Sequence, residues 1–435
     1  MLKKIFKTAV VFIITAEAKF ILKKYKPRII AVTGSVGKTS TKDAVFSVLS
    51  SKGFVRKSEK SFNSEIGVPL TILGRPNAWS NPFAWISTIF AGLLLIIKPG
   101  KYPEWLVLEV GADRPGDIKR IASWLLPDVV VVTRLAPVPV HVEYFSSPGA
   151  VFKEKGELVK ALKKDGTLVL SADDENVLVL EKLASGRKLV TFGFSRKASV
   201  MGSKVAIAYE GRGISRHPIG VHFSVRMNDE RAEIGVRGSV GRQMAYAALA
   251  ALATGISVGL SMSDAVKGLL RYEGPLGRMR LVEGIKHTLI IDDTYNSSPV
   301  AVQEALDALA SLSTKGRKIA VLGDMLELGR FSVEEHHAIG TYAFTRADML
   351  VTVGIRSRDT ARGAIEAGFA GENILQFDDS RKAGKALEGL IKEGDVILIK
   401  GSQGIRMERA VEEIMAHPED REQLLVRQEE EWMKR

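Results

Sequence analysis

The sequence of 435 residues has no cysteine, no internal repeat and no low-complexity tract. It also lacks an uninterrupted apolar run of the roughly 20 residues that a membrane-spanning helix needs. The absence of cysteine excludes thiolate metal sites, thiol nucleophiles, iron–sulfur clusters and a disulfide scaffold. The composition, 46% hydrophobic and 26% charged, is typical of a globular chain, and its length predicts two or three domains.

The net charge of +12 is unevenly distributed. Residues 1–30 carry eight Lys or Arg against Glu17 alone, a net charge of +7, which leaves +5 for the other 405 residues. No basic stripe interleaved with aromatic residues occurs elsewhere in the sequence. We therefore expect no nucleic-acid partner.

Two apolar segments predict helices that could contact a membrane. Residues 1–27 are apolar and basic, but charged residues interrupt the run and no clear signal-peptide cleavage site follows. We expect a basic helix there, either on a membrane surface or docked on the protein's own core. A membrane-spanning helix is less favoured, because it would place charges near the centre of the membrane. Residues 83–97, bounded by prolines, are too short to span and predict a buried or surface-seeking helix.

From residue 28 onward, short β-branched runs alternate with helical stretches, which is typical of parallel α/β sheets. The expected strands are 29–33, 105–110, 128–133, 167–170, 189–192, 288–292, 318–322, 349–353 and 395–400. Residues 200–240 differ, because glycines punctuate an alternating pattern that predicts antiparallel hairpins. A charged helix is expected at 418–435.

These patterns predict an α/β protein of three parts, with a linker at the Gly-Pro-Leu-Gly segment 274–277. Residues 1–27 form the basic apolar helix. Residues 28–274 form a central ATPase domain of the P-loop type, with a parallel sheet and an antiparallel hairpin subdomain. Residues 275–435 form a smaller Rossmann-like α/β domain.

A candidate phosphate loop follows the first strand. It reads Thr33-Gly34-Ser35-Val36-Gly37-Lys38-Thr39-Ser40 and leads into a helical stretch. Glycines allow a tight turn whose N–H groups face phosphate oxygens, while Lys38 would reach the β- and γ-phosphates and Thr39 would bind Mg²⁺. The full pattern has glycine where this chain has Val32, so the spacing matches only in part. The order of strand, loop and helix supports the interpretation.

Three further residues are candidates for metal binding. Glu109 ends a predicted strand, at the edge where parallel sheets bind ligands, although it could instead cap a helix. His141 follows another strand and could equally be structural. Lys155 falls within the apolar stripe of a helix expected to begin at Ser147-Pro148. A buried ion pair or a snorkelling side chain would explain it; alternatively, a neutral amine there could add carbon dioxide, giving a carbamate able to bind Mg²⁺.

Eight motifs in this order resemble the Mur ligase family, whose members use ATP to add amino acids or dipeptides to the peptidoglycan precursor. They are VTGSVGKTSTKD, SFNSEIGVPLTIL, LVLEVGADRPGDI, LAPVPVHVEYF, KEKGEL, DDTYNSSP, VLGDMLELG and ILIKGS, within residues 28–415. The pattern is most similar to the branch that joins D-alanyl-D-alanine to UDP-N-acetylmuramoyl-tripeptide. The resemblance implies a cytoplasmic ligase of cell wall biogenesis, cell shape and cell division, which works through an acyl phosphate.

The resemblance also implies roles for particular residues. The implied catalytic residues are Lys38, Glu109, His141 and Lys155. The implied ligands of two Mg²⁺ ions are Thr39, Glu109, His141 and the carbamate of Lys155. The implied ATP contacts are Thr33, Gly34, Ser35, Val36, Gly37, Lys38, Thr39, Ser40, Arg278 and Asn296. The implied substrate contacts are Asn63, Asp324, Glu327, Lys400 and Ser402.

The chain departs from the family pattern in four respects. The phosphate loop starts at residue 33, whereas relatives in this branch carry a UDP-binding domain ahead of it, so a membrane-associated substrate is an alternative. In the helix after the hairpins, Gln243 and Ala247 stand where the family has His and Asn. The family also has Asn at the positions of Ser298 and Ser61. Two other functions remain open: a ligase of the folyl- or poly-γ-glutamate type, and a membrane-tethered nucleotide-binding scaffold without ligase activity.

Overall fold

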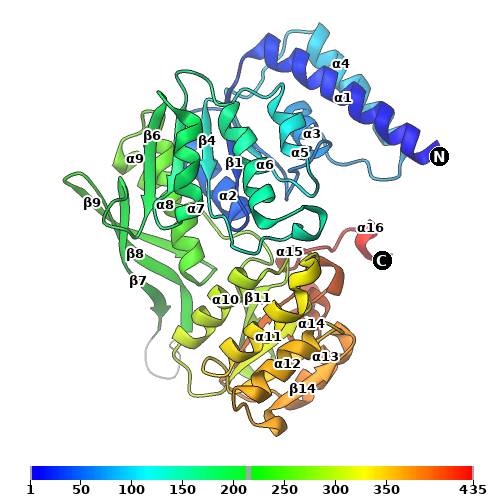
Figure 1. The fold of residues 1–435 in the computed structure, drawn as a ribbon, viewed down its shortest axis with the longest axis vertical. Helices are drawn as coiled ribbons and strands as arrows, with labels where there is room; N and C mark the ends of the chain where they lie inside the picture. The colour runs from blue at the N-terminus through cyan, green and yellow to red at the C-terminus, as the bar shows by residue number, and fades with distance from the viewer. Residues whose placement is uncertain (1, 212–216, 434–435) are drawn as a thin grey trace.

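The computed structural model describes residues 2–211 and 217–433. Two sheets with helices on their faces organise this part of the chain (Figure 1). The first has nine strands and the second has six. The α/β fold class predicted from the sequence, including the antiparallel hairpins of the first sheet, is confirmed.

The first sheet has the order β2-β3-β1-β4-β5-β6-β7-β8-β9. Its strands are β1 Arg28–Thr33, β2 Val55–Lys57, β3 Trp105–Glu109, β4 Val129–Val132, β5 Thr167–Ser171, β6 Lys188–Gly193, β7 Val200–Glu210, β8 His217–Met227 and β9 Glu230–Arg237. In this order, each strand from β2 through β1 to β7 pairs in parallel with the next. Strands β7, β8 and β9 form the antiparallel hairpins. Strand β1 is central, and only its first residue is exposed.

Helices cover both faces of this sheet because its central strands are apolar on both sides. The helices are α2 Lys38–Leu49, α3 Gly67–Leu73, α5 Asp117–Ala122, α6 Pro148–Lys160, α7 Glu175–Leu178, α8 Arg242–Ser257 and α9 Met262–Leu269. Ile30 and Val32 of β1 belong to the core with α2, α8 and α9. Ile29 and Ala31 belong to the opposite core, with α3, α5 and α6. Alternate residues of one strand thus hold both helix layers in place.

The second sheet has the order β10-β11-β15-β12-β13-β14. Its strands are β10 Arg280–Gly284, β11 Thr288–Asp293, β12 Lys318–Gly323, β13 Met349–Val353, β14 Ile374–Phe377 and β15 Val396–Lys400. Only β10 is antiparallel to its neighbour. The helices are α10 Pro299–Ser311, α11 Ser332–Ala343, α12 Ser357–Glu366, α13 Ser380–Leu390 and α14 Glu408–Ile414. The expected linker at 274–277 lies between α9 and β10.

Helices α1 Leu2–Tyr25 and α4 Pro82–Ile97 run alongside each other at the edge of the molecule farthest from the second sheet (Figure 1). They occupy the two apolar segments noted in the sequence. The Nζ of Lys24 donates hydrogen bonds to three carbonyls at the end of α4, at 2.7–3.0 Å. We call the first sheet with its helices the first unit, and the second sheet with its helices the second unit. One face of α1 packs on the first unit through Val10, Ile14 and Ala18. Among the described residues, we find no helix both long and apolar enough to cross a membrane.

The prediction of one charged helix at 418–435 is wrong. The described residues contain two short helices instead, α15 Arg421–Leu424 and α16 Glu430–Met433. Leu425 and Arg427 lie between them and are buried. The Arg427 Nη1 donates to Glu408 Oε2 at 2.9 Å, so the chain turns back to the core where a helix would have continued into solvent.

Candidate active site

The phosphate loop joins β1 to the start of α2. Gly34 has φ +146°, and a Cβ there would lie 2.0 Å from Thr133 Oγ1, so no larger residue fits. Gly37, at the N-cap of α2, has φ +83° and no neighbouring atom within 4 Å of the Cβ position. The first turn of a 12-residue helix therefore opens onto free space. Its unpaired N–H groups and its dipole favour an anion such as phosphate.

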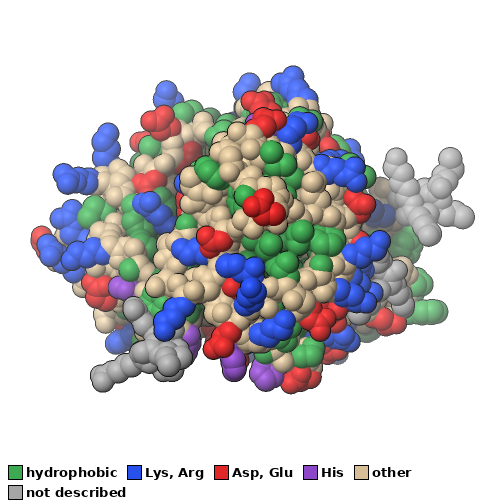
Figure 2. Space-filling model, turned by 90° about the horizontal axis from the view of Figure 1, so that it is seen from below, with side chains coloured by type: hydrophobic (Ala, Val, Ile, Leu, Met, Phe, Trp, Pro, Cys, Tyr) green, Lys and Arg blue, Asp and Glu red, His purple; other side chains and the backbone are tan. Residues whose placement is uncertain are grey.

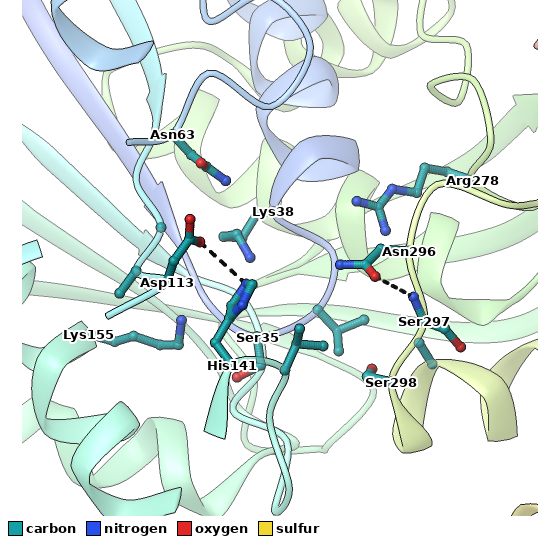
Figure 3. Close-up of a pocket in the computed structure, with 15 residues that line it drawn as sticks. Ser35, Lys38, Asn63, Asp113, His141, Lys155, Arg278, Asn296, Ser297 and Ser298 are labelled. Atoms are coloured by element: carbon teal, nitrogen blue, oxygen red, sulfur yellow. Dashed lines mark hydrogen bonds and ion pairs between the residues drawn. The ribbon is translucent and has the colours of Figure 1, made fainter. Parts of the chain in front are cut away.

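This loop forms one wall of a cavity between the two units (Figure 3). The lining residues of the first unit include Ser35, Val36, Lys38, Asn63, Asp113, His141 and Lys155, and those of the second are Arg278, Asn296, Ser297, Ser298 and Ala301. Three buried polar atoms at this cavity, Ser35 Oγ, Arg278 Nε and Ser297 Oγ, have no hydrogen-bond partner in the described part of the chain. Buried polar groups are normally paired. A polar ligand that contacts both units would satisfy them.

Glu109, at the end of β3, lies immediately behind the loop and is 1% exposed. Its Oε2 accepts a hydrogen bond from Thr39 Oγ1 at 3.0 Å, and its Oε1 accepts one from Asn63 Nδ2 at 3.0 Å. A hydroxyl and a carboxylate oxygen fit a magnesium ion that takes its other ligands from phosphate oxygens and water. No group of three His, Asp or Glu side chains among the described residues could hold a metal alone.

Lys155, on α6, is buried in the apolar stripe that its periodicity predicted, between Val151 and Leu158. Ser147 caps this helix by accepting the Ala150 N–H at 3.2 Å. The Lys155 Nζ donates to the Gly34 carbonyl at 3.0 Å, and within the described residues no carboxylate is at ion-pair distance. Burial, reinforced by the charge of Lys38, lowers the pKa of Lys155 to about 7. A neutral amine is therefore well populated near neutral pH.

His141 bridges the two units. Its Nδ1 is 2.6 Å from Glu327 Oε2 of the second unit, and its Nε2 is 3.4 Å from Asp113 Oδ1 of the first. The hydrogen bond from His141 holds the pKa of Glu327 below its usual value. Figure 3 shows His141 at the cavity, facing Asp113. His141 thus joins the two units at the wall of the cavity.

The second unit contributes Arg278 and Asn296 directly to the cavity. The Arg278 guanidinium lies over the Tyr295 ring, 4.2 Å from its centroid. Lys400 is 1% exposed and lies behind Asn296, where its Nζ donates to the Asn296 carbonyl at 2.8 Å and to Asp293 Oδ2 at 2.6 Å. Lys400 thus fixes the backbone at the cavity wall.

Two other predicted substrate residues are also buried away from the cavity. Asp324 Oδ1 accepts the Ser357 N–H at 2.7 Å, and Ser402 Oγ accepts the Leu326 N–H at 2.8 Å. These bonds position the loop that presents Glu327 to His141. The predicted residues that do not line the cavity are Thr33, Gly34, Gly37, Thr39, Ser40, Glu109, Asp324, Glu327, Lys400 and Ser402.

The sequence did not single out Asp113, Ser297 or Ala301, which line the cavity. Asp113 follows Glu109 by four residues at the same strand end, so its position was a usable signal. Two departures from the family pattern lie in the site: Ser61 Oγ is 3.1 Å from Thr39 Oγ1, and Ser298 lines the cavity.

Comparisons with known proteins identify the family of the chain. The chain matches the Mur ligase middle domain over residues 88–255 and the Mur ligase glutamate ligase domain over residues 277–403. It is 28% identical to UDP-N-acetylmuramoyl-tripeptide–D-alanyl-D-alanine ligase of Bacillus subtilis, covering 92% of this chain and 79% of that one. The enzyme of the same name from Mycobacterium leprae is 32% identical, with 87% and 71% covered.

Among solved structures, MurF ligase from Thermotoga maritima in complex with ADP is 26% identical, with a TM-score of 0.74 and coverage of 95% of this chain and 84% of that one. Both units and the order of their motifs are thus shared with known ligases. The chain belongs to the Mur ligase family.

Proposed function

We propose that the protein is an ATP-dependent amide ligase that joins D-alanyl-D-alanine to a UDP-N-acetylmuramoyl-tripeptide in peptidoglycan precursor synthesis. One observation carries this proposal: a phosphate loop, backed by the Thr39–Glu109 pair, and Lys155 lie at a cavity that Arg278 of the second unit also lines. The relatives named for this reaction supply the identity of the substrates.

The loop suits the triphosphate of ATP. Gly37 leaves the start of α2 open, and the Lys38 ammonium, which bonds only to the Gly34 carbonyl in the structure, can neutralise phosphate charge. ATP supplies a phosphoryl group: an oxygen of the acceptor carboxylate bonds to the γ-phosphorus as ADP leaves. The amine of the second substrate then attacks the acyl carbon, loses a proton, and inorganic phosphate departs. Arg278 from the second unit faces the nucleotide side, so closure of the units aligns the reactants.

Magnesium belongs to the same proposal, with two ions expected. Thr39 and Glu109 would hold one, and His141 with the carbamate of Lys155 would hold the other; both would offset the charge between carboxylate and triphosphate. The environment of Lys155 supports the carbamate, because its neutral nitrogen can bond to the carbon of CO₂ and release one proton. The carbamate is a carboxylate group, and it replaces an amine that the fold buries without a carboxylate partner.

On the substrate side, we propose direct contact for Asn63 and Glu327, at the cavity and its rim. Asp324, Lys400 and Ser402 would act through the loops that they hold. We also propose that the enzyme acts in the cytoplasm, where ATP is available, and serves cell wall biogenesis, cell shape and cell division. Contact of residues 1–27 and 83–97 with a membrane surface would bring it to the inner face of that membrane.

The decisive experiment measures phosphate release from ATP and Mg²⁺ with UDP-N-acetylmuramoyl-tripeptide, with and without D-alanyl-D-alanine. Release that requires both, with the pentapeptide product seen by mass spectrometry, is expected. Lys38→Ala is the matched control and should release none. Release that requires glutamate with a folate or a poly-γ-glutamate acceptor would support the alternative ligases instead. Absence of release with every acceptor and amine would favour a scaffold.

A further inference from the structure

Helices α1 and α4 together form what we call the arm. On α4, a row of large apolar side chains is exposed, from 44% for Leu93 to 80% for Phe83. The row is Phe83, Ile86, Phe90, Leu93 and Ile97. At 100° per residue these positions fall within about 100° of one another, so they form one stripe along the helix. Only Trp85, Thr88 and Gly92 of this helix are buried.

Helix α1 exposes a second stripe. Phe6, Ile13 and Phe20 recur every seven residues, and Phe12, 75% exposed, lies beside them. The neighbouring face of α1, which carries Val10, Ile14 and Ala18, is buried in the first unit. Each helix of the arm therefore buries one side and leaves the other apolar side to solvent. Contiguous apolar patches of this kind mark interaction surfaces.

The charge of the arm is entirely basic at its surface. Lys19 and Lys23 are exposed and fall within about 20° of Phe12 on the helical wheel of α1. The one acid of α1, Glu17, is 7% exposed, and burial raises its pKa to about 7. No Asp or Glu occurs between Glu65 and Glu104, the segment that contains α4. By contrast, the face of the second unit in Figure 2 carries acidic and basic side chains side by side.

We propose that the arm docks on the surface of an anionic lipid bilayer, with its apolar stripes at the acyl boundary and its lysines against lipid phosphates. A helix with an apolar face and flanking lysines lies in the membrane interface without crossing it. A second copy of the chain fits less well, because pairing two arms would bring lysines against lysines. This inference does not depend on the proposed ligase activity.

Co-sedimentation of the full chain with vesicles tests the proposal. The vesicles contain either phosphatidylcholine alone or phosphatidylcholine with phosphatidylglycerol. The triple variant Phe83→Ser, Phe90→Ser and Ile97→Ser changes only exposed positions of α4. Its matched control, Val179→Ser with Leu270→Ser, removes two apolar side chains that are 61% and 73% exposed elsewhere. A third variant, Lys19→Gln with Lys23→Gln, removes two charges.

We expect the wild type and the control to bind the anionic vesicles, and the triple variant to lose at least about tenfold in partition coefficient. The double lysine variant should lose about fivefold per charge, and added salt should weaken wild-type binding. Equal binding by the triple variant, or no binding by the wild type, would overturn the proposal. A wild-type dimer that the triple variant converts to a monomer, without vesicle binding, would assign the stripes to a second copy.

Discussion

Two buried lysines, one at each sheet, show how the same residue can serve chemistry or architecture. Lys155 beside the first sheet and Lys400 at the end of β15 are 3% and 1% exposed. Lys400 has a carboxylate partner, Asp293, at 2.6 Å, whereas the one hydrogen bond that Lys155 Nζ makes with a described residue is to the Gly34 carbonyl. A buried ion pair completes a fold, while a buried amine without an acid tends to lose its proton. The difference supports a structural role for Lys400 at the cavity wall and the proposed role of Lys155 in the reaction.

The largest expected effect is that of Lys155→Ala on ligation. We expect a loss of about a thousandfold or more in kcat, because a metal-binding carboxylate disappears from the site. The variant should still fold, since no buried acid is left unpaired, and circular dichroism checks this. A short carboxylate such as formate, added to the assay, should restore part of the activity. Full activity of the variant without additive would contradict the carbamate role.

Lys400→Met should show the reverse pattern, with its main effect on stability. Removing the cation leaves the Asp293 carboxylate buried without a countercharge, although it still accepts the Met279 N–H, and this costs about 3–5 kcal/mol. Urea unfolding measures this cost. The double variant Lys400→Met with Asp293→Leu should recover much of it, because both charges are then gone. If the single variant were as stable as wild type, Lys400 would not be the structural member of the pair.

Titration of the wild type against Lys155→Met should separate the lysines further. In CO₂-free buffer the folded pKa of Lys155, about 7, lies below its ordinary 10.5. Between these values the unfolded chain holds a proton that the folded chain has released, so wild-type stability should rise with pH relative to the variant. The cost of burying Lys155 is constant below pH 7 and vanishes above 10.5. A flat difference across this window would contradict the depressed pKa.

Carbamate formation should follow the same titration. With ¹³C-labelled bicarbonate, a carbamate signal in the NMR spectrum should persist above pH 7 and fade below it, as the amine becomes protonated. Lys155→Met supplies the blank, and Lys400→Met should keep the signal because Lys400 is held by Asp293. A signal that survives in Lys155→Met would place the carbamate on another lysine.

The sequence predicted the parts of this fold that local patterns determine. All nine expected parallel-type strands are present, and most of them are apolar runs buried on both faces. The three unpredicted strands, β2, β10 and β14, lie at sheet edges and have three to five residues. Such strands are half exposed, so no clear hydrophobic pattern distinguishes them from loops.

The same distinction applies to the site. The burial of Lys155 could be predicted because its neighbours on one helix face are apolar, and these neighbours are close in the sequence. The partner of Lys400 could not be predicted, because Asp293 lies 107 residues away in the sequence and the pairing of β11 with β15 brings the two together. The contact between His141 and Glu327 likewise depends on how two separately built units pack. Sequence patterns predicted the chemical groups, and tertiary packing decided their partners.

The smallest expected effect tests that packing. Glu327→Gln removes a charge that is 36% exposed and pairs with His141 across the two units. Half-exposed ion pairs contribute no more than about 1 kcal/mol, so kcat should fall less than about fivefold. Because His141 lowers the pKa of Glu327, the pair persists above the ordinary carboxyl pKa and weakens only as pH falls through the lower value. The variant should therefore differ from wild type at neutral pH and converge with it in acid. The proposed contact of Glu327 with the substrate predicts in addition a raised KM for the amine substrate, whereas an unchanged KM would restrict Glu327 to its contact with His141 across the two units.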